Sequence, residues 1–214
     1  MGLDQYLLAK VSNKEKLAQL KTEATGACGG LFPLTIKTNG KAELGYWRKW
    51  YKLNDYLWGL LRDTTGYKNY LAKEIAYQIN KYSNPDNIQD TWYETKAEVL
   101  AGIKKAGSVE TYVTAKVLAD RSAPNCEPIR IPKRLVKEII QYAKDNVEYY
   151  KTPEGIEDSH EECFEEWDSK ATEETLQEYL EWTIKDWEGV VKTFTTALEL
   201  MDNYNASIYY EVWY

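Results

Sequence analysis

The chain has 214 residues, enough for one hydrophobic core, and its apolar and charged contents are typical of a folded globular protein rather than a disordered one. No apolar run approaches the roughly 20 residues that a membrane-spanning helix needs. The start of the chain lacks the basic and long apolar regions of a secretory signal. Cys28, Cys126 and Cys163 lie far apart without a CxxC pair. We therefore expect free thiols in a reducing cytoplasm, and no cofactor or zinc site.

The net charge of −7 is unevenly distributed along the chain. Residues 1–153 contain 24 Lys and Arg against 17 Asp and Glu, whereas residues 154–214 contain 3 against 17. The acidic segment is either a solvated face or a surface that competes with nucleic acid for a basic protein groove. Direct nucleic-acid binding is disfavoured, because this segment would repel phosphates.

The N-terminal third predicts strands around one short helix. Residues 2–11 are typical of a strand, and Ser12 and Glu15 form a predicted capping box for the helix that follows. Residues 31–38 predict a second strand, and the turn Asn39-Gly40 closes a hairpin onto residues 41–46.

A helix is expected from about Trp47 to Leu61, because its apolar residues recur at spacings of three and four. That stripe consists of Trp50, Leu53, Leu57, Leu60 and Leu61. On this interpretation Arg48 and Lys49 occupy the first turn, where the helix dipole disfavours cations. Two cations there indicate an acidic partner or an anionic ligand.

Residues 63–122 predict a helical insertion. Its helices are expected at 67–82, at 88–106 with Gly107 as the closing residue, and at 108–121, although the last segment also alternates like a strand. Residues 125–131 are predicted to be extended.

The C-terminal part predicts two helices and a final strand. Pro132 is expected to begin a helix with a buried face, formed by Leu135, Val136, Ile139, Ile140, Ala143 and Val147. The next helix is predicted over 175–201, ending at Asp202-Asn203. Residues 206–214 alternate, with Ile208, Tyr210 and Val212 on one face and Tyr209, Glu211 and Trp213 on the other.

The candidate ligand-binding residues cluster around the start of the predicted helix. They are Glu43, Tyr46, Trp47, Arg48, Lys49 and Lys52. Arg48 and the lysines suit phosphate groups, and the aromatic rings suit stacking on a base. The alternative is structural, with Trp47 and Trp50 in the core and Arg48 and Lys49 paired with acidic residues of the C-terminal region.

Catalysis and metal binding have weaker support in the sequence. His160, the single histidine, lies with Cys163 in the acidic stretch 157–168, but their spacing matches no established ligand pattern. A solvated acidic loop or helix is the favoured interpretation. Asp4, Glu43 and Glu181 would supply paired carboxylates for acid–base chemistry only if the fold brought them together.

Several segments resemble a family of small bacteriophage accessory proteins. The start Met1-Gly-Leu-Asp4-x-Tyr6-Leu7 and the motif Gly45-Tyr46-Trp47-Arg48-Lys49 carry the resemblance, with weaker support from Asn125-Cys126 and Tyr179-x-Glu181-Trp182. After the motif, relatives usually have Asn and a His-Trp pairing where this chain has Tyr51, Asn54 and Tyr56. The resemblance implies a phage protein acting in the bacterial host cytoplasm, with no established activity.

Together these patterns predict one α+β domain over 1–214, with a mainly antiparallel sheet that pairs the N- and C-terminal strands, backed by helices. The first functional hypothesis is a non-catalytic phage counter-defence protein that sequesters a nucleotide-like anionic ligand. The second is an acidic inhibitor of a basic host immune or nucleic-acid-processing protein. The third is a small phage hydrolase acting on a phosphorylated ligand.

Overall fold

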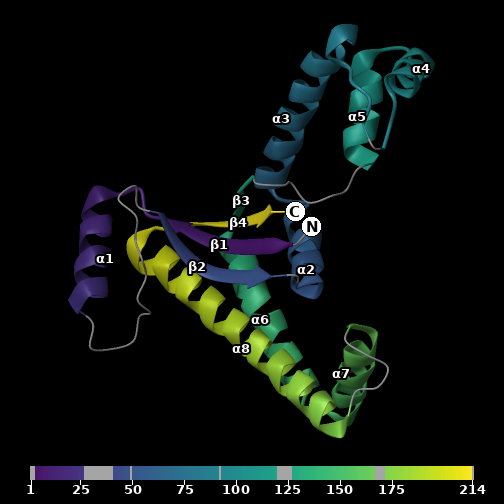
Figure 1. Ribbon diagram of the computed structural model, residues 1–214. Helices are drawn as coiled ribbons and strands as arrows, with labels where there is room; N and C mark the ends of the chain where they lie inside the picture. The colour runs from purple at the N-terminus through teal and green to yellow at the C-terminus, as the bar shows by residue number, and fades with distance from the viewer. Residues whose placement is uncertain are drawn as a thin grey trace.

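The computed structural model describes residues 3–26, 41–48, 50–91, 93–119, 127–166 and 172–213. It is an α+β fold with a four-stranded antiparallel sheet in the order β2-β1-β4-β3 (Figure 1). The strands are β1 (Asp4–Lys10), β2 (Lys41–Arg48), β3 (Ile129–Ile131) and β4 (Ser207–Trp213). The N- and C-terminal strands form the central pair, which confirms the predicted pairing.

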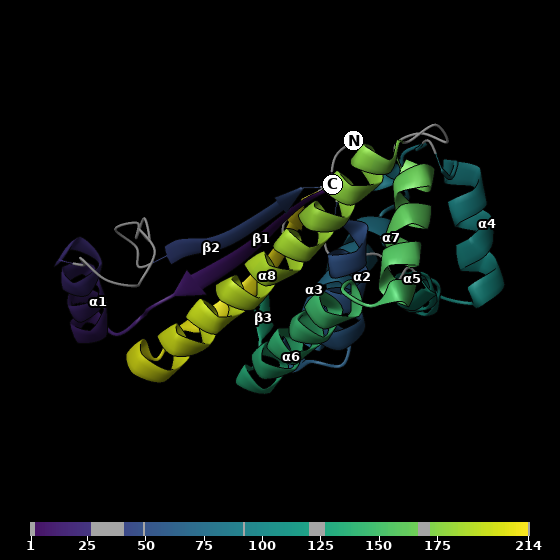
Figure 2. The same ribbon diagram turned by 90° about the horizontal axis from the view of Figure 1, so that it is seen from below.

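One group of helices forms a layer beneath the sheet, and another forms an arm that projects from it. The first and last are α1 (Lys14–Gly26) and α8 (Glu173–Tyr204), and the others are α2 (Tyr51–Leu61), α3 (Thr65–Tyr82), α4 (Lys96–Ala106), α5 (Val109–Ala119), α6 (Lys133–Tyr149) and α7 (Pro153–Glu166). Helices α6 and α8 cross one face of the sheet, as the view from below shows (Figure 2). Helices α3, α4 and α5 form the predicted helical insertion, which we call the helical arm. No helix in the described ranges is long and apolar enough to cross a membrane.

The core lies between the sheet and this helical layer. Leu7, Ile208 and Val212 point from the two central strands into it with no exposed surface, and Leu57 of α2 and Phe194 of α8 meet them there. The final strand therefore has the two faces that its alternation predicts. The predicted buried face of the helix after Pro132 is also confirmed, except that Ile140 is only partly buried.

A buried polar network joins the sheet to α2. Gln5 on β1 has no exposed surface, and its amide nitrogen donates to the Trp50 carbonyl at 2.9 Å. The Tyr210 hydroxyl lies 2.7 Å from Gln5 Oε1, to which it donates, and 3.1 Å from Asn54 Oδ1. Buried polar groups must find such partners, so the network fixes the position at which α2 begins.

Several predicted element boundaries are wrong. Residues 47 and 48 belong to β2, and α2 begins at Tyr51, because Trp47 and Arg48 pair with Gln5 and Asp4 across the sheet. Asn13, rather than Ser12, caps α1 by accepting from the amides of Glu15 and Lys16. Helix α8 also continues past Asp202-Asn203 to Tyr204 and ends at Asn205 in the left-handed conformation.

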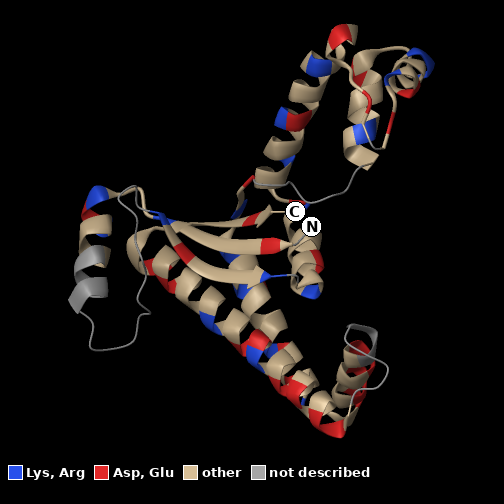
Figure 3. Cartoon of the chain, viewed as in Figure 1, with Lys and Arg blue, Asp and Glu red and all other residues tan. Residues whose placement is uncertain are grey.

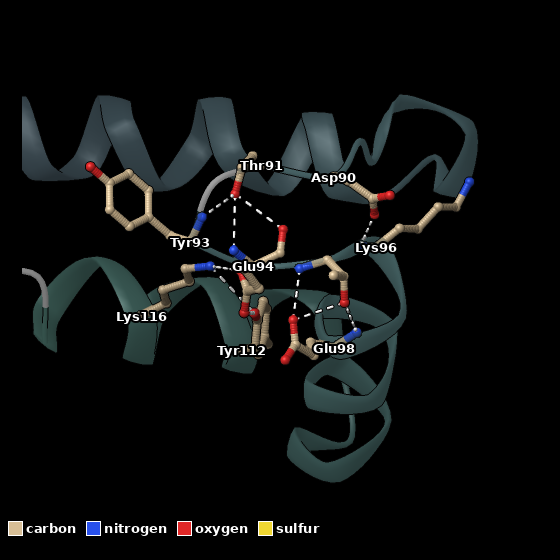
Figure 4. A network of polar contacts seen from close by, with 9 residues as sticks. Asp90, Thr91, Tyr93, Glu94, Lys96, Glu98, Tyr112 and Lys116 are labelled. Carbon is tan, nitrogen blue, oxygen red and sulfur yellow. Dashed lines mark hydrogen bonds and ion pairs between the residues drawn. The ribbon is translucent and has the colours of Figure 1, made fainter.

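The helix that the sequence predicts over 88–106 is shorter in the structure, where α4 begins only at Lys96. Thr95 and Glu98 form a capping box there, and the Asp90 carboxylate accepts from the Lys96 amide (Figure 4). Glu94 accepts from the Tyr112 hydroxyl at 2.7 Å and forms an ion pair with Lys116 on α5. These contacts hold residues 90, 91 and 93–95 as a loop against α5. Gly107 ends α4 as predicted, and residues 109–119 form the favoured helix rather than a strand. The predicted strand over 31–38 and its turn lie outside the described residues.

A bulge in β2 determines which side chains face away from the helices. Leu7 pairs with Gly45 but Leu8 pairs with Glu43, so Leu44 is the extra residue. The bulge therefore shifts the alternation by one, and Ala42, Leu44 and Trp47 face the core while Glu43 and Tyr46 face outward. Helix α8 approaches β2 closely at Gly45, because an added Cβ would sit 2.8 Å from Thr193 Cγ2 and 2.7 Å from the Trp47 ring.

This close approach predicts opposite effects for two glycine substitutions. Gly45→Ala forces α8 or Trp47 to move, and we expect it to lower the free energy of unfolding by about 1–3 kcal/mol. Gly59→Ala, in the interior of α2 with no atom within 4 Å of the added methyl, is the control and should raise it by about 0.5–1 kcal/mol. Chemical denaturation of both variants measures the difference. Equal effects would contradict the close approach at Gly45.

Candidate functional site

The structure separates the predicted site residues into three places. Glu43, Tyr46 and Arg48 lie on the face of the sheet opposite α6 and α8, whereas Trp47 points to the helix side and stacks on Phe194 of α8 with ring centroids 6.2 Å apart. Lys52 lies on α2, away from that face. Lys49 lies outside the described residues.

The interpretation of Arg48 as a cation in the first turn of a helix is therefore wrong. Arg48 ends a strand, and its Nε lies 3.9 Å from Asp4 on the neighbouring strand. The structural alternative holds for the tryptophans, since Trp47 and Trp50 both pack against the core and Trp50 contacts Trp187 at 4.7 Å. Arg48 has its partner on the N-terminal strand, not in the C-terminal region.

Strand pairing arranges the outward residues of β2, β1 and β4 in rows. The first row is Arg48, Asp4 and Trp213, the second is Tyr46, Tyr6 and Glu211, and the third is Glu43, Leu8 and Tyr209. We call these nine residues the open face. Within the described part of the chain, the helical layer of α6 and α8 lies on the other side of the sheet (Figures 1 and 2).

Three aromatic residues from two of these rows meet across β2, β1 and β4. We call Tyr46, Tyr6 and Trp213 the aromatic row. The Tyr6 ring lies 5.1 Å from the Tyr46 ring and 6.4 Å from the Trp213 ring, which it meets edge to face. Tyr46 and Trp213 keep 47% and 51% of their surface exposed. Exposed aromatic rings held against one another provide contact area without a large loss of side-chain entropy on binding.

Carboxylates surround this aromatic row. The Tyr46 hydroxyl donates a hydrogen bond to Asp4 Oδ1 at 2.8 Å, and this bond raises the Tyr46 pKa. The pKa of Tyr6 is raised by partial desolvation and then by the negative charges of Asp4, Glu43 and Glu211. Both tyrosines are therefore neutral hydroxyl donors at physiological pH, set in a locally negative field.

Of the three carboxylates that the sequence offered for acid–base chemistry, Asp4 and Glu43 lie near Tyr6, whereas Glu181 does not join them. Glu181 lies on α8, where it accepts from Gln177, and Glu211 of β4 takes its place near Tyr6. Sequence reasoning missed Tyr6, Glu211 and Trp213 as site residues. The signal was available, because β4 alternates clearly and was predicted to pair with the N-terminal strand.

Lys52 has a separate role, which links α2 to the acidic helix α7. Its Nζ donates to the Tyr150 hydroxyl at 2.8 Å and forms an ion pair with Glu162. Beside it, the Tyr149 hydroxyl donates to Asp158, which raises the Tyr149 pKa to about 12. The acidic residues of α7 and of the adjoining end of α8 lie far from the sheet (Figure 3).

His160 and Cys163 both lie on α7, where Cys163 is fully buried. Among the described residues, no three His, Cys, Asp or Glu side chains gather closely enough to hold a metal ion.

Comparisons with protein-family models, with curated proteins and with solved structures found no match for this chain. The geometry of its own residues therefore carries the functional argument.

The Lys52 contacts predict a specific loss of stability at alkaline pH. Desolvation lowers the Lys52 pKa, but the hydrogen bonds to Glu162 and Tyr150 outweigh it, and the net shift is upward. A raised folded-state pKa contributes stability that is complete below the unfolded value of about 10.4 and is lost as pH rises above it. We expect the melting temperature of the wild type to fall more steeply above that pH than that of Lys52→Met.

Lys151→Met is the matched control, because Lys151 forms only an exposed contact with Glu148 three residues away. Its melting curve should follow the wild type across the same pH range. Parallel curves for the wild type and Lys52→Met would show that Lys52 does not stabilise the fold through its charge.

Proposed function

We propose that this protein acts by binding rather than by catalysis, and that its partner docks on the open face. The observation that carries the proposal is the aromatic row across three strands, in which Tyr46 and Trp213 are about half exposed and each contacts the Tyr6 ring between them. Exposed aromatic residues are enriched at the energetically important centres of protein interfaces. A sheet with one face packed on helices presents its other face as a continuous rigid platform.

The charges around the row favour a partner with a basic surface. Asp4, Glu43 and Glu211 all lie close enough to Tyr6 to act on its hydroxyl. A phosphate brought onto this part of the face would be repelled by these carboxylates, whereas Lys or Arg side chains of a partner would be attracted. This supports the inhibitor hypothesis and moves its binding surface from the acidic helices to the sheet.

A nucleotide-like ligand is the second candidate, and one observation favours it. The Arg48 side chain is 67% exposed, and its long contact with Asp4 leaves guanidinium donors for a phosphate beside the exposed Tyr46 ring. A base would stack on Tyr46 while Arg48 binds its phosphate.

The resemblance to phage accessory proteins is the reason for placing the partner in a bacterial host. Under this proposal the protein is a counter-defence factor that blocks a basic host immune or nucleic-acid-processing protein.

The docking proposal predicts that two exposed aromatic residues control partner binding. A partner found by cross-linking in bacterial lysate and then purified should bind Tyr46→Ala/Trp213→Ala at least about tenfold more weakly than the wild type. Tyr77→Ala/Tyr93→Ala is the matched control, because these tyrosines of the helical arm are 62% and 96% exposed. Affinity is measured by titration calorimetry.

The same variants separate the competing interpretations. Equal affinity of both double variants for the purified partner would overturn docking on the open face. A panel of linear and cyclic nucleotides tests the second candidate by thermal shift. A nucleotide that raises the melting temperature of the wild type but not of Arg48→Glu would establish the second candidate in place of the first.

A further inference from the structure

The open face contains a hollow above the central strand β1. Its volume is about 340 Å3, and Tyr6 and Leu8 of β1 form its floor. Glu43 and Lys41 of β2 form one side, and Glu211 and Trp213 of β4 form the other. The floor belongs to the strand that pairs with both neighbours, and the hollow lies beside the bulge in β2, so paired strands form the hollow among the described residues.

Two carboxylates, those of Glu43 and Glu211, line this hollow from opposite sides of β1. Glu43 pairs with Leu8 and Glu211 pairs with Tyr6, so the two lie diagonally, about 10 Å apart across the sheet at about 4.8 Å per strand and two residues apart along β1. A planar group that contacts both carboxylates therefore lies diagonally over β1. The two carboxylates cannot neutralise each other, and among the described residues that line the hollow Lys41 supplies the one ammonium.

Each of these carboxylates has oxygen atoms available for a ligand. Glu43 makes no hydrogen bond or ion pair with any residue that the structure describes. Glu211 accepts from the Trp213 indole at 2.9 Å through Oε1. That bond fixes the Trp213 ring beside the carboxylate, and the second oxygen of Glu211 is left for another donor.

The walls combine what a guanidinium group requires. A guanidinium is planar, stacks on aromatic rings, and bonds to carboxylates through a fork of N–H donors. Here Tyr6 and Trp213 supply the ring surfaces and Glu43 and Glu211 supply the acceptors. A lysine ammonium would gain the charge attraction but neither the stacking nor the forked hydrogen bonds.

We propose that the hollow between Tyr6, Glu43, Glu211 and Trp213 is a recognition site for an arginine side chain of the docking partner. This inference rests on the proposed function and identifies the group that anchors the partner. The arginine enters over β1, its guanidinium lies between Glu43 and Glu211, and its plane packs against Trp213. Lys41 at the rim disfavours a second basic residue on that side.

The probe for this site is N-acetyl-arginine amide, titrated into the protein while the Trp213 indole N–H signal is followed by nuclear magnetic resonance. The signal is assigned by its loss in Trp213→Phe. We expect a saturable shift with the arginine probe, no shift with the matching citrulline amide, and binding about tenfold weaker with the lysine amide. Citrulline has nearly the same shape as arginine without its charge.

Two variants that preserve shape test the carboxylates. Glu43→Gln and Glu211→Gln should each weaken arginine binding about tenfold, because each removes one charge-assisted pair. Glu110→Gln, an exposed residue in the first turn of α5, is the control and should bind as the wild type does. An unmoved Trp213 signal, equal shifts with arginine and lysine, or full affinity in both glutamine variants would overturn the arginine site.

These results are distinguishable from a failure of the proposed function. A partner that requires Tyr46 and Trp213, combined with no response to the arginine probe, would support docking on the open face and overturn the arginine site. A saturable arginine response that survives in Tyr46→Ala, combined with a partner that binds Tyr46→Ala/Trp213→Ala as tightly as the wild type, would support the arginine site and overturn docking on the open face.

Discussion

The buried hydrogen bonds around Gln5 are the constraint on which the rest of the arrangement depends. Gln5 and Tyr210 have no exposed surface and lie on the two central strands, and together they hold the Trp50 carbonyl and Asn54 at the start of α2. Loss of one partner would leave a buried polar group unpaired, at a cost of about 1–3 kcal/mol. Helix α2 therefore begins at one defined place after β2. Arg48 and Lys52, four residues apart, have different surroundings as a result: Arg48 contacts Asp4 on the open face, and Lys52 contacts Tyr150 and Glu162.

The motif Gly45-Tyr46-Trp47-Arg48 divides its residues between structure and surface by strand alternation. Gly45 allows α8 to approach, and Trp47 stacks on Phe194, so both contribute to the helix side of the sheet. Tyr46 and Arg48 point the other way and contact Asp4. Because the packed and the exposed side chains lie on opposite faces of one strand, the exposed residues can change without disturbing the core. A substitution at Trp47 or Gly45, in contrast, would affect both.

The sequence predicts the fold better than it predicts the site, for a physical reason. The alternation of residues 206–214 and the periodicity after Pro132 are local patterns, and both indicate the correct element and the correct buried face. Trp47 and Arg48 continue a helical stripe locally, but their pairing with β1 overrides it. The bulge at Leu44 and the row of Tyr46, Tyr6 and Trp213 exist only because three distant segments pair. Glu43, Tyr46 and Arg48 are candidates because they lie in or beside one local motif, whereas Glu211 and Trp213 join them only through the register of the sheet.

The position of the two terminal strands has a consequence for how the chain folds. Their pairing, Asp4 opposite Trp213, closes a loop of almost the whole described chain, and such closures carry the largest entropic cost and form slowly. During synthesis β1 leaves the ribosome long before its central neighbour β4. Strand β2 can pair with one edge of β1 early, but the other edge stays open until residues 207–213 have been added. During this interval the open strand edge and the inward side chains Leu7 and Ala9 favour aggregation.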